Sequence, residues 1–111
     1  MNLTIALHYD LTPEWGGNRT DSKPTVFHMR MLTSPEREQF LKWEYSGVGV
    51  KLVPDRAGLV QTAVLGIDNL VVNGDSVKDA KTFLATPGLF GMFSEVAADI
   101  VAQNTRDEPK N

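Results

Sequence analysis

The spacing of apolar residues changes along this chain, from every second residue near its beginning to every third or fourth residue near its end. In residues 2–10, one side of the segment is apolar and carries Leu3, Ile5, Leu7 and Tyr9. Residues 25–32 repeat the alternation with Phe27, Met29 and Met31. A period of two is typical of half-buried strands, and two consecutive alternating segments favour an antiparallel pair. A long polar connection, residues 11–24, joins the two predicted strands.

The helical period is clearest in residues 87–103. The apolar stripe of this segment consists of Leu89, Phe93, Val96 and Ile100. Phe90 and Ala97 extend it on one side and Met92 on the other, so the apolar arc covers about half of the circumference of an ideal helix. We expect the central stripe to be buried, with Phe93→Ala costing about 3–5 kcal/mol.

A second helix is predicted over residues 33–45. Thr33 and Glu36 have the spacing of a capping box, and Pro35 suits a first helical turn because its missing N–H has no partner there. Phe40 and Leu41 would face the core. The glycines that follow are expected to end this helix, and residues 48–53 have the composition of a strand.

The next part of the chain predicts a helix, a short strand and a third helix. Residues 55–67 place apolar side chains at helical spacing, and residues 69–72 are predicted to form the strand. Asn73 and Gly74 supply the positive φ angles of a tight turn. We expect Asp75 or Ser76 to cap the helix that follows. Its inner face would carry Val77, Ala80 and either Phe83 or Leu84.

Together these elements predict an α+β fold. A small antiparallel sheet from the N-terminal half would pack against three or four helices, mostly from the C-terminal half. A chain of 111 residues suits one domain with a single modest core. We expect that domain to span residues 1–103, followed by a flexible tail of residues 104–111, which are polar.

Charge and residue content argue against several functions. The net charge is −3 and no basic cluster is present to hold a phosphate backbone, so nucleic acid is not an expected partner. The absence of cysteine excludes disulfides, thiolate metal sites and cysteine nucleophiles. No run of about 18 apolar residues predicts a membrane span, and the first residues lack the basic region of a signal peptide. We therefore expect a cytoplasmic protein.

His8, Asp10 and His28 are the candidate metal ligands. If the first two strands pair so that His8 lies opposite His28, both imidazoles share one sheet face, with Asp10 nearby. Two nitrogens and one oxygen could then hold zinc or iron, as in a small metal-dependent enzyme. The alternative, which we favour, is an inert polar face of a half-exposed sheet, with no cofactor.

Two features favour a protein partner. Trp15 lies in a glycine-bearing loop, where it could anchor an interface or fold back over its own sheet. The wide apolar arc of the last helix places Phe90 and Met92 at its margins, where they could form a partner surface or be wedged against another helix. As a partner surface, both should tolerate serine with little loss of stability.

Three stretches of the chain resemble the tail assembly chaperones of long-tailed phages and prophages. "MRMLTSPEREQFL" resembles the pattern R-x-L-[ST]-x-x-E-R-x-x-F of that family, and the matching positions are Arg30, Leu32, Thr33, Glu36, Arg37 and Phe40. "AVLGIDNLVVNG" is similar to the segment before the family's Asn-Gly or Asp-Gly turn. "FLATPGLFGMFSEVAADIVAQN" is similar to its C-terminal pair of helices. The resemblance covers residues 27–104.

This resemblance implies a function without catalysis. Tail assembly chaperones are small acidic cytoplasmic proteins that coat the long helical tape-measure protein, keep it soluble and help to recruit tail-tube subunits. The partners expected from the resemblance are therefore the tape-measure and tail-tube proteins. A structural virion component, such as a tail completion or head–tail joining protein, is the alternative in another class, and it would form rings.

Overall fold

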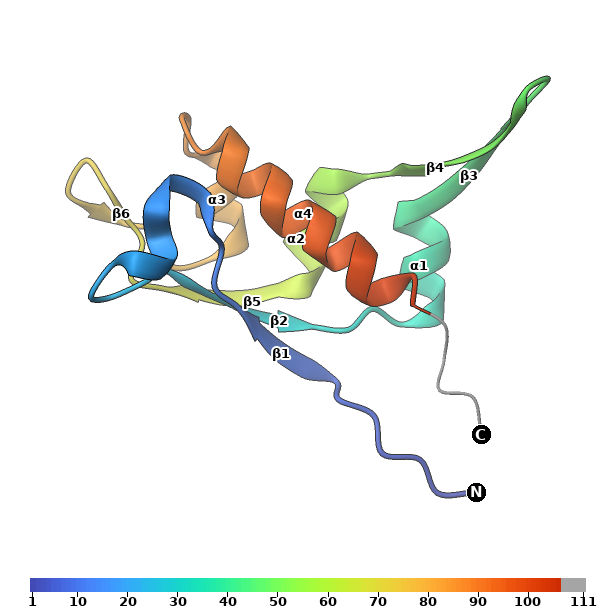
Figure 1. Ribbon diagram of the computed structural model, residues 1–111, viewed down its shortest axis with the longest axis horizontal. Helices are drawn as coiled ribbons and strands as arrows, with labels where there is room; N and C mark the ends of the chain where they lie inside the picture. The colour runs from blue at the N-terminus through green and yellow to red at the C-terminus, as the bar shows by residue number, and fades with distance from the viewer. Residues whose placement is uncertain (107–111) are drawn as a thin grey trace.

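The computed structural model describes residues 1–106 and confirms the α+β class. Its elements, in chain order, are β1 (His8–Leu11), the 3-10 helix η1 (Trp15–Thr20), β2 (Val26–Arg30), α1 (Ser34–Phe40), β3 (Leu41–Ser46), β4 (Gly49–Pro54), α2 (Arg56–Ala63), β5 (Val64–Asp68), β6 (Val71–Val72), β7 (Asp75–Ser76), α3 (Ala80–Ala85) and α4 (Phe90–Asn104). The helices gather on one side of the central sheet, and the β3–β4 hairpin projects away from both (Figure 1).

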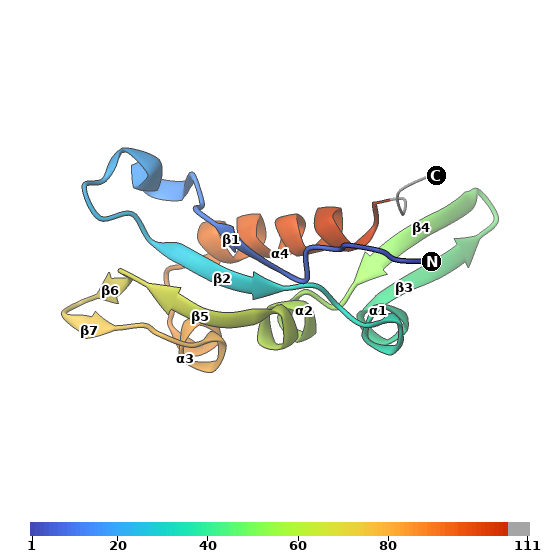
Figure 2. The same ribbon diagram turned by 90° about the horizontal axis from the view of Figure 1, so that it is seen from below.

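The central sheet has the antiparallel order β1-β2-β5. Alternation in β2 buries Phe27 and Met29 completely, as the sequence predicted, and turns His28 to the other face. In Figure 2 the strands lie in front of α4, so the helices cover one face of the sheet and leave the other open. The core lies between the sheet and α2, α3 and α4, where the rings of Phe27 and Phe83 meet edge to face at 5.1 Å.

β1 is shorter than predicted. Pairing with β2 starts at His8, which lies opposite Arg30 at the end of that strand. The strand expected from residue 2 is therefore wrong for residues 2–7, because β2 offers no partner beyond this point. Leu3, Ile5 and Leu7 are each at least half exposed.

The helix predicted over residues 33–45 is correct at its start and wrong at its end. The capping box forms, since Thr33 N donates to Glu36 Oε1 at 2.9 Å and Glu36 N donates to Thr33 Oγ1 at 3.4 Å. However, α1 ends at Phe40, and the following residues form β3, which pairs with the predicted strand β4. Cross-strand pairing of aromatic and aliphatic side chains outweighs continuation of the helix there.

The helix predicted over residues 55–67 is also too long. Asp55 caps α2 by accepting a hydrogen bond from Gly58 N at 3.0 Å, and the helix ends at Ala63. Val64 begins β5, and Val64 and Ile67 are buried. β5 forms because β2 presents an open edge to it. Local spacing does not contain that information.

The Asn73-Gly74 turn is confirmed, but it serves a hairpin alone. φ is 51° at Asn73 and 84° at Gly74, as in the two-residue turns that connect antiparallel strands. Asp75 and Ser76 form β7, and the prediction that either caps a helix is wrong. Asp79 caps α3 instead, accepting a hydrogen bond from Thr82 N at 2.7 Å. The predicted inner face is correct, with Val77, Ala80 and Phe83 buried.

The last helix is confirmed as α4, although it begins and ends later than the predicted range of residues 87–103. Asn104 had been assigned to a flexible tail. It is instead the last helical residue, buried, with its side chain accepting a hydrogen bond from Leu32 N at 2.9 Å and donating to Ile100 O at 2.8 Å. The rest of the predicted tail from residue 107 lies outside the described residues.

Candidate protein-binding surfaces

Trp15 packs against its own molecule. Its indole lies on Gly91 of α4, at a distance that leaves no room for a Cβ atom on that glycine. The backbone N–H groups of Glu14 and Trp15 donate to the two carboxylate oxygens of Glu95 at 2.7 and 3.0 Å, which holds η1 against α4. The structure therefore places the indole over a helix and not over the sheet, which was one of the two alternatives from the sequence. Trp15 remains 41% exposed, and its role as an interface anchor stays a prediction.

Phe90 lies at the exposed start of α4. Its side chain is 72% exposed, and its ring centroid is 6.2 Å from that of Phe93. The Arg56 guanidinium covers both rings, with its central carbon 5.4 Å from the Phe90 centroid and 4.9 Å from that of Phe93. Phe93 is therefore half-buried, packed against the core and covered on one side by Arg56. The sequence pattern predicted a fully buried position in the centre of the stripe.

An uncharged hollow borders these rings. It has a volume of about 400 Å³ and is called the Phe90 hollow below. Its lining residues are Ala57, Phe83, Leu84, Thr86, Pro87, Gly88, Leu89, Phe90 and Phe93. A hollow of this kind is suited to a large apolar side chain from a partner, because apolar anchors in pockets dominate many interfaces.

Met92 lies on the opposite side of the same helix, in the core. It is 3% exposed, so it cannot contact a partner in this conformation. The expectation that Met92 belongs to a partner surface is therefore wrong, and the alternative of a buried position in a helix packed against another helix is correct, since α2 packs against α4. Its replacement by serine would place a hydroxyl in the core and should destabilise the fold.

The β3–β4 hairpin presents a second apolar surface, which the sequence analysis missed. Side chains directly opposite one another in an antiparallel pair share a face. The pairs Leu41–Pro54, Trp43–Leu52 and Tyr45–Val50 therefore make one face apolar, while the pair Glu44–Lys51 lies on the other. Trp43 is 59% exposed and Tyr45 is 82% exposed. The alternation of Leu41, Trp43 and Tyr45 was the available signal, but the capping box had assigned these residues to a helix.

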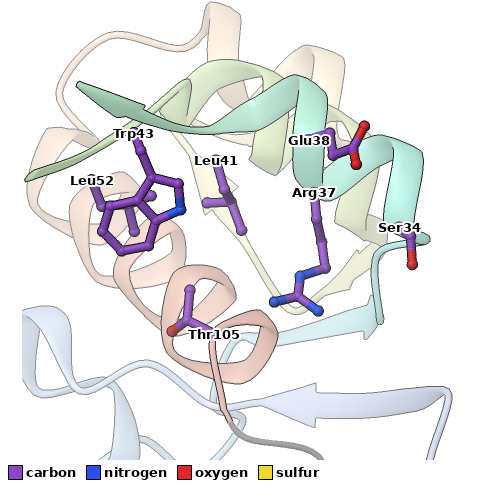
Figure 3. Close-up of a pocket in the computed structure, with 7 residues that line it drawn as sticks. All are labelled: Ser34, Arg37, Glu38, Leu41, Trp43, Leu52 and Thr105. Atoms are coloured by element: carbon purple, nitrogen blue, oxygen red, sulfur yellow. The ribbon is translucent and has the colours of Figure 1, made fainter. Parts of the chain in front are cut away.

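The base of this face forms a hollow with α1 and the end of α4. It is lined by Ser34, Arg37, Glu38, Leu41, Trp43, Leu52 and Thr105, and its volume is about 350 Å³. Arg37, Leu41 and Trp43 extend into the same space, which Thr105 closes from the side of α4 (Figure 3). Arg37 also borders a neighbouring hollow that contains Ile5 and Leu7. The apolar hairpin and residues 1–7 thus border adjoining hollows at one end of the molecule.

The proposed metal ligands are arranged differently from the expectation. His8 lies opposite Arg30, and His28 lies opposite Asp10. The His28 ring is held between two carboxylates, with Nε2 2.7 Å from Asp68 Oδ2 and Nδ1 2.8 Å from Asp10 Oδ1. Within residues 1–106 no cluster of three or more His, Asp or Glu side chains has the arrangement of a metal site. Asp68, which sequence reasoning left out, reaches His28 through the unpredicted strand β5.

Tyr9 of β1 and Asp99 of α4 are close enough for the carboxylate to influence the phenol. The Tyr9 hydroxyl and Asp99 Oδ2 are both buried, and neither has a hydrogen-bond partner within residues 1–106. Burial raises the pKa of Tyr9, and the Asp99 carboxylate raises it further, so the phenol is neutral at ordinary pH.

Comparison with known proteins gives no family assignment. No protein-family model matches the chain, and neither the curated proteins nor the solved structures yielded a match. Among residues 1–106, no helix has both the length and the apolar character needed to span a bilayer.

Proposed function

We propose that this chain is a non-enzymatic protein-binding protein, specifically a tail assembly chaperone of a long-tailed phage or prophage. The observation that supports the proposal is the uncovered apolar surface at the start of α4. There Phe90 is largely exposed beside the uncharged Phe90 hollow. Uncovered apolar side chains next to a hollow are typical of surfaces that bind other proteins.

The proposed partner is the long helical tape-measure protein. An amphipathic helix places apolar side chains at positions i, i+3, i+4 and i+7, and such a helix binds by inserting these anchors into an apolar groove. One anchor would occupy the Phe90 hollow and pack on the rings of Phe90 and Phe93. Arg56, which lies over one side of these rings, would meet an acidic residue on the polar side of the helix. Binding of this kind needs no cofactor, and it would take place in the host cytoplasm.

The test is co-expression with a phage tape-measure protein, whose long amphipathic helices are the proposed ligand. We expect wild-type protein to keep that partner in the soluble fraction and to bind it after purification. Phe90→Ser should weaken binding by about tenfold or more, because the ring is an anchor of the surface. Its own unfolding temperature should change little, since most of the ring is already exposed.

Val71→Ser is the matched control, because Val71 is 62% exposed on β6 and lies outside the Phe90 hollow. It should bind as the wild type does. If Phe90→Ser also binds as the wild type does, or if the partner is equally soluble without this chain, the proposal is wrong.

A ring-forming virion component is the second candidate. The projecting apolar hairpin favours it, because such extensions are suited to contacts between subunits. Light scattering of the purified protein separates the two candidates. A stable closed ring of six or more copies, formed without the helical partner, would favour the virion component over the chaperone.

A further inference from the structure

The β3–β4 hairpin is an incomplete sheet. Two-stranded hairpins are marginally stable in water, and a third strand or a packed face is usually needed. Here β3 and β4 pair with each other alone in the described part of the chain, so both outer edges are open. The apolar face carrying Trp43, Tyr45 and Val50 is exposed along most of its length.

Residues 1–7, called the leading segment, have the pattern of a strand but lack a partner strand. Leu3, Ile5 and Leu7 alternate with the uncharged residues Asn2, Thr4 and Ala6, which is the pattern of a strand with one apolar face. A hydrogen bond from Met31 N to Leu7 O, 2.8 Å, holds the end of the segment. Before Leu7, its backbone makes no hydrogen bond with any other residue of the range 1–106.

We propose that the leading segment of one copy of this chain adds as a third strand to the β3–β4 hairpin of a second copy. Edge addition would satisfy backbone groups of both elements. With a period of two, Leu3, Ile5 and Leu7 would extend the apolar face of the hairpin, and Asn2, Thr4 and Ala6 would join its polar face. No side-chain charge of residues 2–7 would be desolvated.

The leading segment is proposed to pair with the hairpin of a second copy because, within one molecule, it points away from its own hairpin. The two elements leave the same end of the molecule in diverging directions, with α1 and the end of α4 between them (Figure 1). Each copy therefore carries both the unpaired leading segment and the open β3–β4 hairpin, so the segment of one copy can pair with the hairpin of the next. Such a contact is head-to-tail, so it generates a ring or an open row of copies.

The pairing does not depend on the Phe90 hollow, which involves α2, α3 and the start of α4. An open row would suit proteins that coat a long helix, and a closed ring would suit a virion component. The interface is small, so we expect association that increases with protein concentration.

The test uses two double variants in size-exclusion chromatography with light scattering. The segment variant carries Leu3→Ser and Ile5→Ser, and the hairpin variant carries Trp43→Ser and Tyr45→Ser. Wild-type protein should associate as its concentration rises, and each variant alone should remain monomeric. An equimolar mixture should form a one-to-one dimer and nothing larger, because the segment variant keeps its hairpin and the hairpin variant keeps its segment.

The control is a variant of the polar hairpin face, Lys42→Ser with Glu44→Ser, which should associate as the wild type does. Circular dichroism checks that each variant is folded. If the hairpin variant fails to fold, hydrogen exchange on wild-type protein tests whether the hairpin pairs with the leading segment of another copy. The hairpin amides should gain protection at high concentration in the wild type and not in the segment variant.

Three results would overturn the proposal. Wild-type protein could remain monomeric at every concentration. The segment variant could still associate, which would indicate a symmetric hairpin-to-hairpin contact. The mixture could fail to form a dimer although both variants are folded. Phe90→Ser should leave self-association unchanged, so failure of this proposal and failure of the proposed function give different results.

Discussion

His28 lies on the open face of the central sheet, between the carboxylates of Asp68 and Asp10. Hydrogen bonds to Asp68 and then to Asp10 raise the pKa of His28 above its ordinary value of 6.5. The charged imidazolium can thus link β1, β2 and β5 across the sheet. Since all three side chains are substantially exposed, solvent weakens this link, and its effect on stability is small.

We predict that Asp68→Asn lowers the pKa of His28, as measured by NMR titration of its ring protons. A raised pKa in the folded state adds stability that is complete below the unfolded value and is lost as the pH rises through the folded value. The variant should therefore lose more unfolding free energy at about pH 5.5 than at about pH 9. Asp75→Asn, on exposed β7, should show no such difference. An unchanged His28 titration in Asp68→Asn would contradict the contact between His28 Nε2 and Asp68 Oδ2.

At the scale of elements, two interactions attach η1 to α4: the packing of the Trp15 indole and hydrogen bonds to the Glu95 carboxylate. Trp15 covers Gly91, and Glu95 accepts hydrogen bonds from the N–H groups of Glu14, just before η1, and of Trp15, its first residue. A glycine in a helix interior costs about 1 kcal/mol relative to alanine, and this is an upper bound for Gly91 in the first turn of α4. The Trp15 indole explains why residue 91 is glycine, because it occupies the space that the methyl group of an alanine would need.

We predict that Gly91→Ala displaces Trp15 into solvent. In a Trp43→Phe background, the emission of Trp15 should shift to longer wavelength. The usual gain of about 1 kcal/mol from replacing a helical glycine should be reduced or absent, since packing is lost. Ala98→Gly, at an exposed position of α4, measures the propensity effect alone. A full gain in stability with unchanged emission would show that Trp15 does not lie on Gly91.

At the scale of the whole molecule, one core holds the sheet and helices together while the hairpin and the leading segment extend from it. Phe27, Leu59, Val60, Val96 and Ile100 are fully buried in that core. Most of the large exposed apolar side chains lie on the hairpin, on the leading segment and at Phe90, and the others are Trp15, Leu65 and Val71. The residues that form the core and those proposed to bind partners are therefore different, so substitutions can separate stability from the proposed binding.

We predict that Phe27→Ala costs about 3–5 kcal/mol, the usual penalty for emptying a fully buried aromatic site. Phe93→Ala should cost less than this range, because the ring is half-buried and covered on one side by Arg56. This replaces the larger cost expected from the sequence. Urea unfolding of both variants measures the difference. Equal costs would mean that Phe93 is as deeply buried as Phe27.

The sequence alone determined the features that act between near neighbours. The Thr33–Glu36 box joins residues three positions apart, and Asn73-Gly74 sets its own backbone angles. The stripe of α4 and the alternation of β2 are also local, and both predicted correct elements and most of their buried residues. The α+β class follows from these signals, because each depends on hydrogen bonds or side-chain spacing within one segment.

Tertiary structure decided what needs a distant partner. Residues 41–46 became a strand because residues 49–54 pair with them, and Val64–Asp68 became a strand because β2 presents an edge. The same pairing brings Asp68 to His28, and helix packing buries Met92 while leaving Phe90 open. Strand pairing and helix burial gain their free energy from contacts between segments far apart in the chain, and no local pattern contains those contacts.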